Sequence, residues 1–167
     1  VENDETINLS MNTFVTVVAG PIVNSVYTIL NDDNSTVSVA AAAATIAEGG
    51  PGAAGTGTFV FTFTNPSATA RTISYMVTGS ATSGTDFVAL PGSFVMPSGS
   101  ITYNLTLTAI ADLIVEGDET VTVMITAVSG APAIAVNAVP ATITITDDDL
   151  PEIRYSPASL TMVEGST

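Results

Sequence analysis

Residues 58–64 read Thr-Phe-Val-Phe-Thr-Phe-Thr, so three phenylalanines alternate with smaller or more polar side chains. Alternation with a period of two places one set of side chains on one face of a β-strand and the other set on the opposite face. The same alternation, with threonine as the usual outward residue, recurs at residues 73–77, 101–108, 120–126 and 142–146. Glycine and proline separate these stretches. The pattern predicts an all-β chain of half-buried antiparallel strands, packed as an immunoglobulin-like β-sandwich.

Two details of this pattern lead to specific expectations. In the stretch 101–108, the apolar residues Ile101, Tyr103, Leu105 and Leu107 are expected to face inward. Residues 40–44 are all alanine, which favours a helix, but β-type sequence flanks them on both sides. We interpret them as part of a long first strand whose small side chains allow a bend between two sheets. A short helix is the alternative interpretation.

The composition argues against several classes of function. The chain has 2 cationic residues against 16 acidic ones, for a net charge of −14, so it is poorly suited to neutralise the phosphates of a nucleic acid. Both cations are arginines, Arg71 and Arg154, which we expect to form surface ion pairs. Histidine and cysteine are absent, so no ordinary base is available to activate a serine. We therefore do not expect an enzyme.

The hydropathy pattern bears on location. A hydrophobic content of 46% argues against a disordered acidic tail. No apolar run approaches the roughly 18 residues that a membrane-spanning helix needs, so membrane insertion is not expected. The sequence opens on an acidic motif rather than a signal peptide, which we interpret as a window of a longer, processed polypeptide. A chain rich in threonine and free of cysteine and lysine is typical of secreted bacterial proteins, so an extracellular or cell-surface location is expected.

The acidic residues are concentrated in short motifs near the ends of the expected strands, and only Glu152 stands apart from them. Carboxylates that gather without lysine or arginine repel one another and favour the binding of a cation. Ca²⁺ is the cation that prefers clustered oxygen ligands. The alternative is a solvated acidic edge that only prevents strands of different molecules from pairing.

Three of the motifs recur at nearly one spacing, which indicates an internal repeat. Glu164-Gly165 follows Glu48-Gly49 by 116 residues (164 − 48), and residues 147–149 follow residues 31–33 by the same separation (147 − 31). Residues 115–120 follow the similar residues 1–6 by 114 (115 − 1). We therefore predict tandem repeats: residues 1–33 as the C-terminal part of one, 34–149 as a complete one, and 150–167 as the first strand of the next.

The complete repeat resembles a Calx-β domain. The resemblance is carried, in order along the chain, by Glu48-Gly49, the stretch Ser83-Gly84-Thr85-Asp86-Phe87, residues 112–120, and residues 143–149, which end in three aspartates. It covers residues 34–149 and both flanking fragments. In members of this family that bind calcium, the ions lie in a carboxylate cluster at one end of the sandwich. The resemblance thus implies a Calx-β-type sandwich with Ca²⁺ as its cofactor.

Carried over by position, the resemblance implies a set of metal ligands, with the Ile114 carbonyl as a further candidate. They are Glu48, Asp86, Asp112, Glu116, Glu119, Asp147, Asp148 and Asp149. In the preceding repeat the equivalents are Glu2, Glu5, Asp32 and Asp33. Ca²⁺ takes about six to eight oxygen ligands, more than any one loop of this chain offers, so several loops must meet. Ala111 stands where the family usually has an aspartate, and Asp118 is expected to point away from the site.

These inferences favour a structural and adhesive function: a Ca²⁺-stiffened stalk or fibre of a large bacterial surface protein. The expected partners are neighbouring Calx-β repeats in the same or adjacent chains, with a cell-surface protein or glycan as a further candidate. One alternative is a subunit of an extracellular filament or sheath, assembled by strand donation between chains. Another is an accessory binding module of a secreted enzyme.

Overall fold

A computed structural model describes residues 3–9, 25–30, 34–50 and 52–151. These residues contain strands but no helix, and therefore no helix that could cross a membrane. The strands are β1 (Glu5–Leu9), β2 (Ser25–Ile29), β3 (Thr36–Ala41), β4 (Thr45–Ala47), β5 (Thr56–Phe63), β6 (Arg71–Thr78), β7 (Ser93–Met96), β8 (Thr102–Thr108), β9 (Glu119–Val128), β10 (Ala135–Val136) and β11 (Ala141–Thr146).

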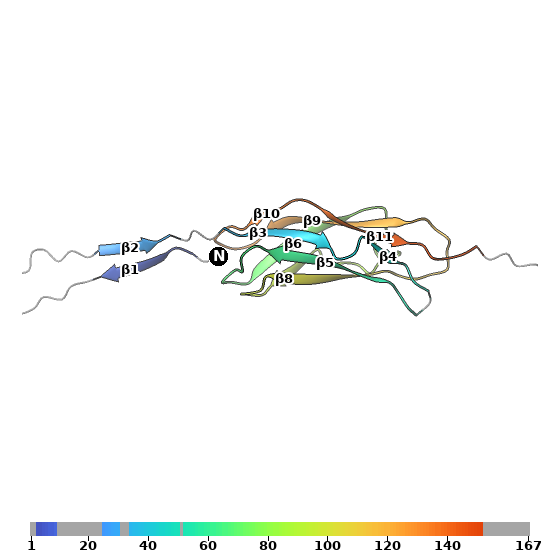
Figure 1. Cartoon of the computed structure of the whole chain (residues 1–167), viewed down its shortest axis with the longest axis horizontal. Helices are drawn as coiled ribbons and strands as arrows, with labels where there is room; N and C mark the ends of the chain where they lie inside the picture. Colours follow the sequence, from blue (N-terminus) through green and yellow to red (C-terminus); the bar gives the residue numbers. More distant parts are fainter. Residues whose placement is uncertain (1–2, 10–24, 31–33, 51, 152–167) are drawn as a thin grey trace, which may run out of the picture.

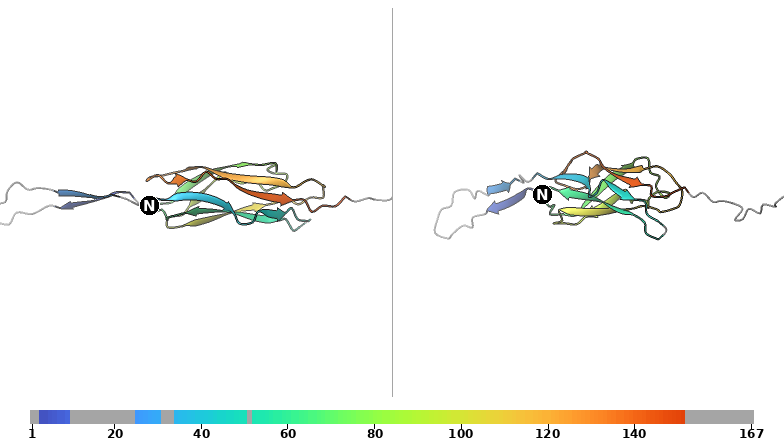
Figure 2. Two further views of the ribbon diagram at one scale, coloured as in Figure 1. Left: turned by 45° about the horizontal axis from the view of Figure 1, so that its top comes forward. Right: turned by 45° about the vertical axis from the view of Figure 1, so that its right-hand side comes forward.

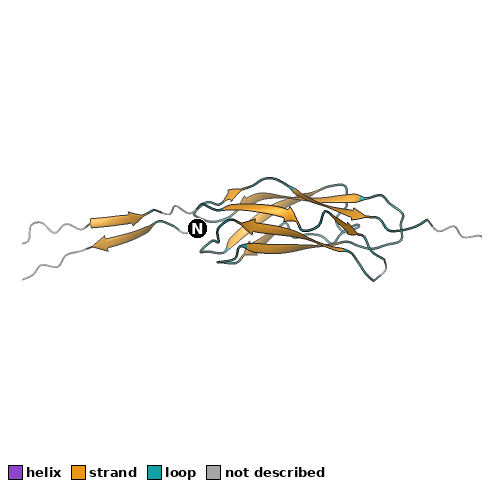
Figure 3. Cartoon of the chain, viewed as in Figure 1, coloured by secondary structure: helices purple, strands orange, loops and turns teal. Residues whose placement is uncertain are grey.

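Strands β3 to β11 form a sandwich of two sheets, which confirms the predicted fold (Figures 1 and 3). One sheet has the order β10-β3-β5-β8, and the other has the order β4-β11-β9-β6-β7. The alternation seen in the sequence explains the packing. On β5, Phe59, Phe61 and Phe63 point into the core and are at most 1% exposed, whereas the residues between them are only partly buried. The core lies between the two sheets.

The alanine run forms a bend between the two sheets, and it is not a helix. Strand β3 pairs with β5 in one sheet, and β4 pairs with β11 in the other. Residues 42–44 form the bend between them. Because the chain changes sheets without reversing direction, β4 runs parallel to β11, and β10 likewise runs parallel to β3. The predicted antiparallel sandwich therefore carries two parallel pairings at its edges.

An aromatic cluster fills the part of the core between β5, β6, β7 and β8. The Phe61 and Phe94 rings meet edge to face with centroids 4.8 Å apart, and the Phe94 and Tyr103 rings stack at 3.8 Å. The prediction for Ile101 was wrong: this residue precedes β8 and is 47% exposed. Ile101 lies at the turn into the strand, where the two-residue alternation no longer determines which side chains are buried.

Arg71, at the start of β6, is buried rather than engaged in a surface ion pair, which corrects the prediction. Its side chain is 1% exposed, although arginine is rarely buried without a carboxylate partner. The guanidinium donates hydrogen bonds to the Ser67 hydroxyl at 2.7 Å, the Ser129 carbonyl at 3.3 Å and the Ala131 carbonyl at 2.9 Å. Arg71 thus ties the start of β6 to the chain that follows β9. Arg154 lies outside the described residues.

Strands β1 and β2 form a separate antiparallel hairpin beyond one end of the sandwich (Figures 1 and 2). Glu5 lies opposite Ile29 in this hairpin, and Glu119 lies opposite Ile145 where β9 meets β11. The described residues contain a single sandwich, formed by β3 to β11, and not two sandwiches in tandem. The proposed boundaries of the flanking repeats stay predictions.

Candidate metal centre

Four segments bring carboxylates to one end of the sandwich. Glu48 follows β4, Asp86 lies in the connection between β6 and β7, residues 112–119 lead from β8 into β9, and residues 147–149 follow β11. β4 and β11 run side by side in the same direction, so Glu48 and Asp147 leave the sheet together. The Glu48 amide also donates to the Thr146 carbonyl at 2.9 Å. The sheet pairing therefore accounts for the meeting of motifs about 100 residues apart in the sequence.

The carboxylates form two groups of three. Glu48, Asp147 and Asp149 each place one carboxylate oxygen within 4.8 Å of the others. Asp86, Glu116 and Glu119 do the same. We call these the first and the second triad. Within the first, Glu48 is buried and the two aspartates are partly buried. Each triad draws its members from at least two segments of the chain, as a calcium site in a sandwich would require.

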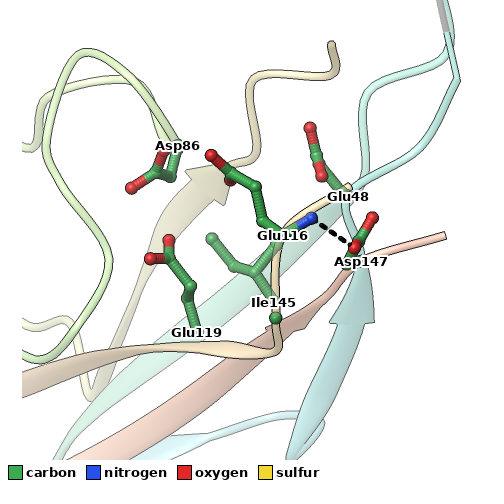
Figure 4. A pocket seen from close by; sticks show the side chains of 7 residues that line it. Glu48, Asp86, Glu116, Glu119, Ile145 and Asp147 are labelled. Carbon is green, nitrogen blue, oxygen red and sulfur yellow. Dashed lines mark hydrogen bonds between the residues drawn. The ribbon is translucent and has the colours of Figure 1, made fainter. Parts of the chain in front are cut away.

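A small cavity of about 10 Å³ lies between the triads, and its size is comparable to a single water molecule or ion. Figure 4 shows Glu116 and Asp86 above this space, Glu119 and Ile145 below it, and Glu48 and Asp147 to one side. Gly117, which has no side chain to fill the space, completes the lining. Ile145 is 4% exposed and closes the side of the space that faces the core.

Backbone amides hold several of the carboxylates in place. The two oxygens of Asp147 accept from the Glu116 amide at 2.7 Å and from the Asp149 amide at 2.9 Å. Glu48 accepts from the Asp112 amide at 2.9 Å, and Asp86 accepts from the Thr82 amide. Each of these bonds satisfies one lone pair and leaves others free to bind a cation. The amides thereby set the orientation of the carboxylates before any ion binds.

The structure places the remaining predicted ligands less centrally. Asp112 lies beside Glu48, but one of its oxygens accepts from the Ile114 amide at 2.7 Å, and it belongs to neither triad. Asp148 accepts a hydrogen bond from the Gly49 amide at 3.1 Å and belongs to neither triad. Asp118 is exposed and outside both triads, as expected.

The predicted site of the preceding repeat falls largely on residues that are not described. Glu2, Asp32 and Asp33 are outside the described residues, and Glu5 is exposed on β1. Sequence reasoning also missed the backbone donors of the main site, among them the amides of Gly49 and Thr82. Backbone groups carry no signature in a sequence, but the glycines at positions 49 and 84 could have indicated a special backbone conformation, and the structure gives them φ of 91° and 88°.

Burial and mutual repulsion raise the pKa of several of these groups. Loss of hydration raises the pKa of Glu119 from 4.5 to about 7, helped by a hydrogen bond with Asp86 and by repulsion from Asp86, Glu116 and Glu48. Desolvation, followed by repulsion from neighbouring carboxylates, also raises the pKa of Glu48, Glu116 and Asp149. For Glu48 the hydrogen bond from the Asp112 amide opposes that increase. A bound divalent cation would remove the repulsion.

The donor set fits Ca²⁺. Every side chain of the two triads is a carboxylate, and carboxylate oxygens are the ligands that this ion prefers. The absence of histidine and cysteine from the chain argues against a site of the zinc type. Described side-chain nitrogen and oxygen atoms that are buried all have hydrogen-bond partners.

The metal-free protein should lose stability as the pH rises from about 4.5 to about 7. In that window the folded state retains protons on Glu119 that the unfolded state, with a pKa near 4.5, has already released. The folded state then binds more protons than the unfolded state, so the free energy of unfolding falls with rising pH. Thermal melts in chelator at pH 5, 6, 7 and 8 measure this. Glu119→Gln should flatten the profile, Asp118→Asn should not, and a melting temperature that rises with pH would contradict the assignment.

Comparison with known proteins identifies the family and supports the fold. A family model described as the Calx-beta domain matches residues 31–149. No curated protein sequence matches the chain. The solved structure of the apo form of the Calx CBD1 domain is 22% identical with a TM-score of 0.52, and the likeness covers 70% of this chain and 100% of that one.

Two further solved structures are similar. The calcium binding domain CBD12 of CALX1.1 is 26% identical with a TM-score of 0.51, and the likeness covers 63% of this chain and 41% of that one. The Calx CBD2 domain is 12% identical with a TM-score of 0.52, over 66% of this chain and 86% of that one. At such low identity, the likenesses to CBD1 and CBD2 show the fold alone.

Proposed function

The chain belongs to the Calx-beta domain family, and on that premise we propose that it is a structural module of an extracellular protein, stiffened by Ca²⁺ at one end. The observation that carries the proposal is the pair of carboxylate triads, which lie where the chain leaves the sandwich and have no lysine or arginine beside them among the described residues. The name of the CBD12 relative, a calcium binding domain, supports Ca²⁺ as the ion.

The triads join the segments that set the direction of the chain at its exit. Asp147 and Asp149 lie within three residues before Leu150 and Pro151, and the first triad connects them to Glu48, which follows β4. The bond from the Glu116 amide to Asp147 links the same segment to the second triad. Ca²⁺ held by these groups would replace repulsion with attraction and pin the end of β11. Pro151 restricts the freedom of the chain further because its ring fixes φ.

The β1–β2 hairpin supports a role among neighbouring repeats. The pairing register of β1 with β2 is the same as that of β9 with β11. Residues of β1 correspond to residues of β9 that lie 114 positions later (119 − 5), and residues of β2 correspond to residues of β11 that lie 116 positions later (145 − 29). Ile7 and Ile29 are 48% and 52% exposed, whereas the equivalent Val121 and Ile145 are at most 4% exposed. We infer that other strands cover this hairpin in the complete protein. A preceding repeat of the same polypeptide is our preferred source, and strand donation from another chain is the alternative.

Calorimetric titration of Ca²⁺ into the metal-stripped chain tests the proposal. We expect saturable binding, with Mg²⁺ binding more weakly because it demands stricter octahedral geometry. Asp147→Asn in the first triad and Glu116→Gln in the second each remove one charged ligand, and each should weaken binding by about tenfold or more. Asp118→Asn removes the same charge outside both triads and is the matched control.

Hydrogen exchange in the same samples separates binding from stiffening. Ca²⁺ should slow amide exchange at residues 112–117 and 147–150, because the ion would link these segments. Binding without such protection would refute the stiffening role. A flat titration would refute calcium binding itself and leave a module whose role rests on its fold.

A further inference from the structure

Strand β6 has an open edge along its second half. Strand β7 pairs with β6 only from Arg71 to Ser74, and the last contact on that side is the Tyr75 amide, which donates to the Gly92 carbonyl at 2.9 Å. Backbone groups alternate in direction along a strand, so the amide and carbonyl of Val77 point to the same side as those of Tyr75. Among the described residues, no backbone group pairs with Val77 on that side.

The connection from β6 to β7 leaves this edge uncovered because it crosses to the other sheet. Phe87 forms a bridge with Ala109, and the Val88 amide donates to the Thr108 carbonyl at 2.9 Å. The crossing leaves a groove of about 270 Å³ between the connection and the β6 edge. Val77, Thr78 and Gly79 line it from β6 and the residue after it, and Ala81, Ser83, Phe87 and Leu90 line it from the connection.

The size and lining of the groove favour one apolar side chain rather than a whole small molecule. Its volume is below the roughly 300–1,000 Å³ of sites that enclose drug-sized ligands. Phe87 is 3% exposed and Val77 and Leu90 are partly buried, so apolar side chains line the floor close to the core, whereas Thr78 and Ser83 add polar groups to the lining. Next to this floor, the open amide and carbonyl of Val77 offer the pairing that a further strand would use.

The negative charge around the groove favours a basic partner strand. Asp86 directly precedes Phe87, and the Ala81 amide donates to the carbonyl of Thr120, the residue after Glu119, at 3.1 Å. The groove therefore borders the second triad. With a net charge of −14 on the chain and Arg71 buried, an acidic partner would be repelled and a basic one attracted.

We propose that the open edge of β6 and its groove bind an extended polypeptide segment of a partner protein, which adds a strand beside Val77. A large apolar side chain of the segment fills the groove, and lysine or arginine near it faces the acidic end of the sandwich. Strand addition provides affinity through the main chain, and the groove and the acids provide the selectivity.

A peptide selection experiment on the full chain, in the presence of Ca²⁺, tests this proposal. The displayed library contains random peptides of about nine residues, which is long enough to span one strand. We expect enriched peptides with a large apolar residue flanked by lysine or arginine. One enriched peptide, labelled with a fluorophore, is then titrated by anisotropy against variants. Val77→Pro removes the edge amide and also changes a side chain that lines the groove, and Ser83→Tyr fills the groove from an exposed position. Each should weaken binding by about tenfold or more.

Controls locate the site. Thr106→Tyr adds the same bulk on the exposed face of β8 in the other sheet and should bind like the original chain. If Val77→Pro does not fold, two other measurements test the site. Ser83→Tyr should still weaken binding, and the bound peptide should slow hydrogen exchange of the Val77 amide in the original chain. Failure to enrich any peptide would overturn the proposal. Equal binding of the peptide to all variants would also overturn it, because this result would indicate attraction to the acidic residues alone. Protection of the amides of residues 102–108 from hydrogen exchange, in place of the Val77 amide, would overturn it as well, because it would place the added strand on β8.

Discussion

Arg71→Ala should lower the free energy of unfolding by about 3–5 kcal/mol, a large share of the stability of a domain of this size. The side chain is 1% exposed and donates to Ser67, Ser129 and Ala131. Truncation leaves two carbonyls without their donors and opens a cavity against β6. At roughly 4 °C per kcal/mol, the melting temperature should fall by about 12–20 °C.

Two milder variants divide this effect. Ser67→Ala removes one acceptor from the guanidinium and should cost about 1–2 kcal/mol. Arg71→Lys keeps the positive charge but has one nitrogen in place of three, so its stability should lie between that of Arg71→Ala and the original chain. Denaturant unfolding followed by fluorescence of the tyrosines measures all three. A loss below about 1 kcal/mol in Arg71→Ala would mean that water replaces the guanidinium at no cost.

Replacing both Glu48 and Glu119 by glutamine should have opposite effects with and without calcium. Saturating Ca²⁺ at about 100 times its Kd adds about 2.7 kcal/mol to the stability of the original chain, or roughly 10 °C in melting temperature. The double variant should lose most of this gain. Without Ca²⁺ it should melt higher than the original chain at pH 7, because two carboxylates with raised pKa and strong mutual repulsion have been neutralised.

The glutamine side chains can still accept the local hydrogen bonds, so the comparison measures the loss of charge rather than the loss of these bonds. In Glu48→Gln, the oxygen of the new side-chain amide would still accept from the Asp112 backbone amide. Asp118→Asn, outside both triads, should change neither melting curve by more than about 0.5 kcal/mol. Thermal melts of the original chain and the double variant, each in chelator and in Ca²⁺, measure the effect. A double variant that is less stable in chelator would show that these carboxylates stabilise the fold without an ion.

Several features of the fold follow from the sequence because they depend on neighbours along the chain. The alternation of Phe59, Phe61 and Phe63 with smaller residues predicts β5 and its buried face, and both are observed. The small side chains of residues 40–44 predict a bend between sheets, which joins β3 to β4. Ile101 was predicted wrongly because a strand must begin somewhere, and the alternation does not show where pairing starts.

The composition and the motifs of the sequence by itself predicted the all-β fold and the gathering of acidic residues, and they favour Ca²⁺ over softer metals as the proposed ion. Only the tertiary structure decided how the carboxylates divide into two triads, because this depends on the parallel pairing of β4 with β11 and on backbone amides with no sequence signature. The same holds for the burial of Arg71 and for the open edge beside Val77. Local sequence patterns determine which face of a strand is buried. Contacts between distant segments determine which groups pair with a buried charge and whether the edge of a strand is covered.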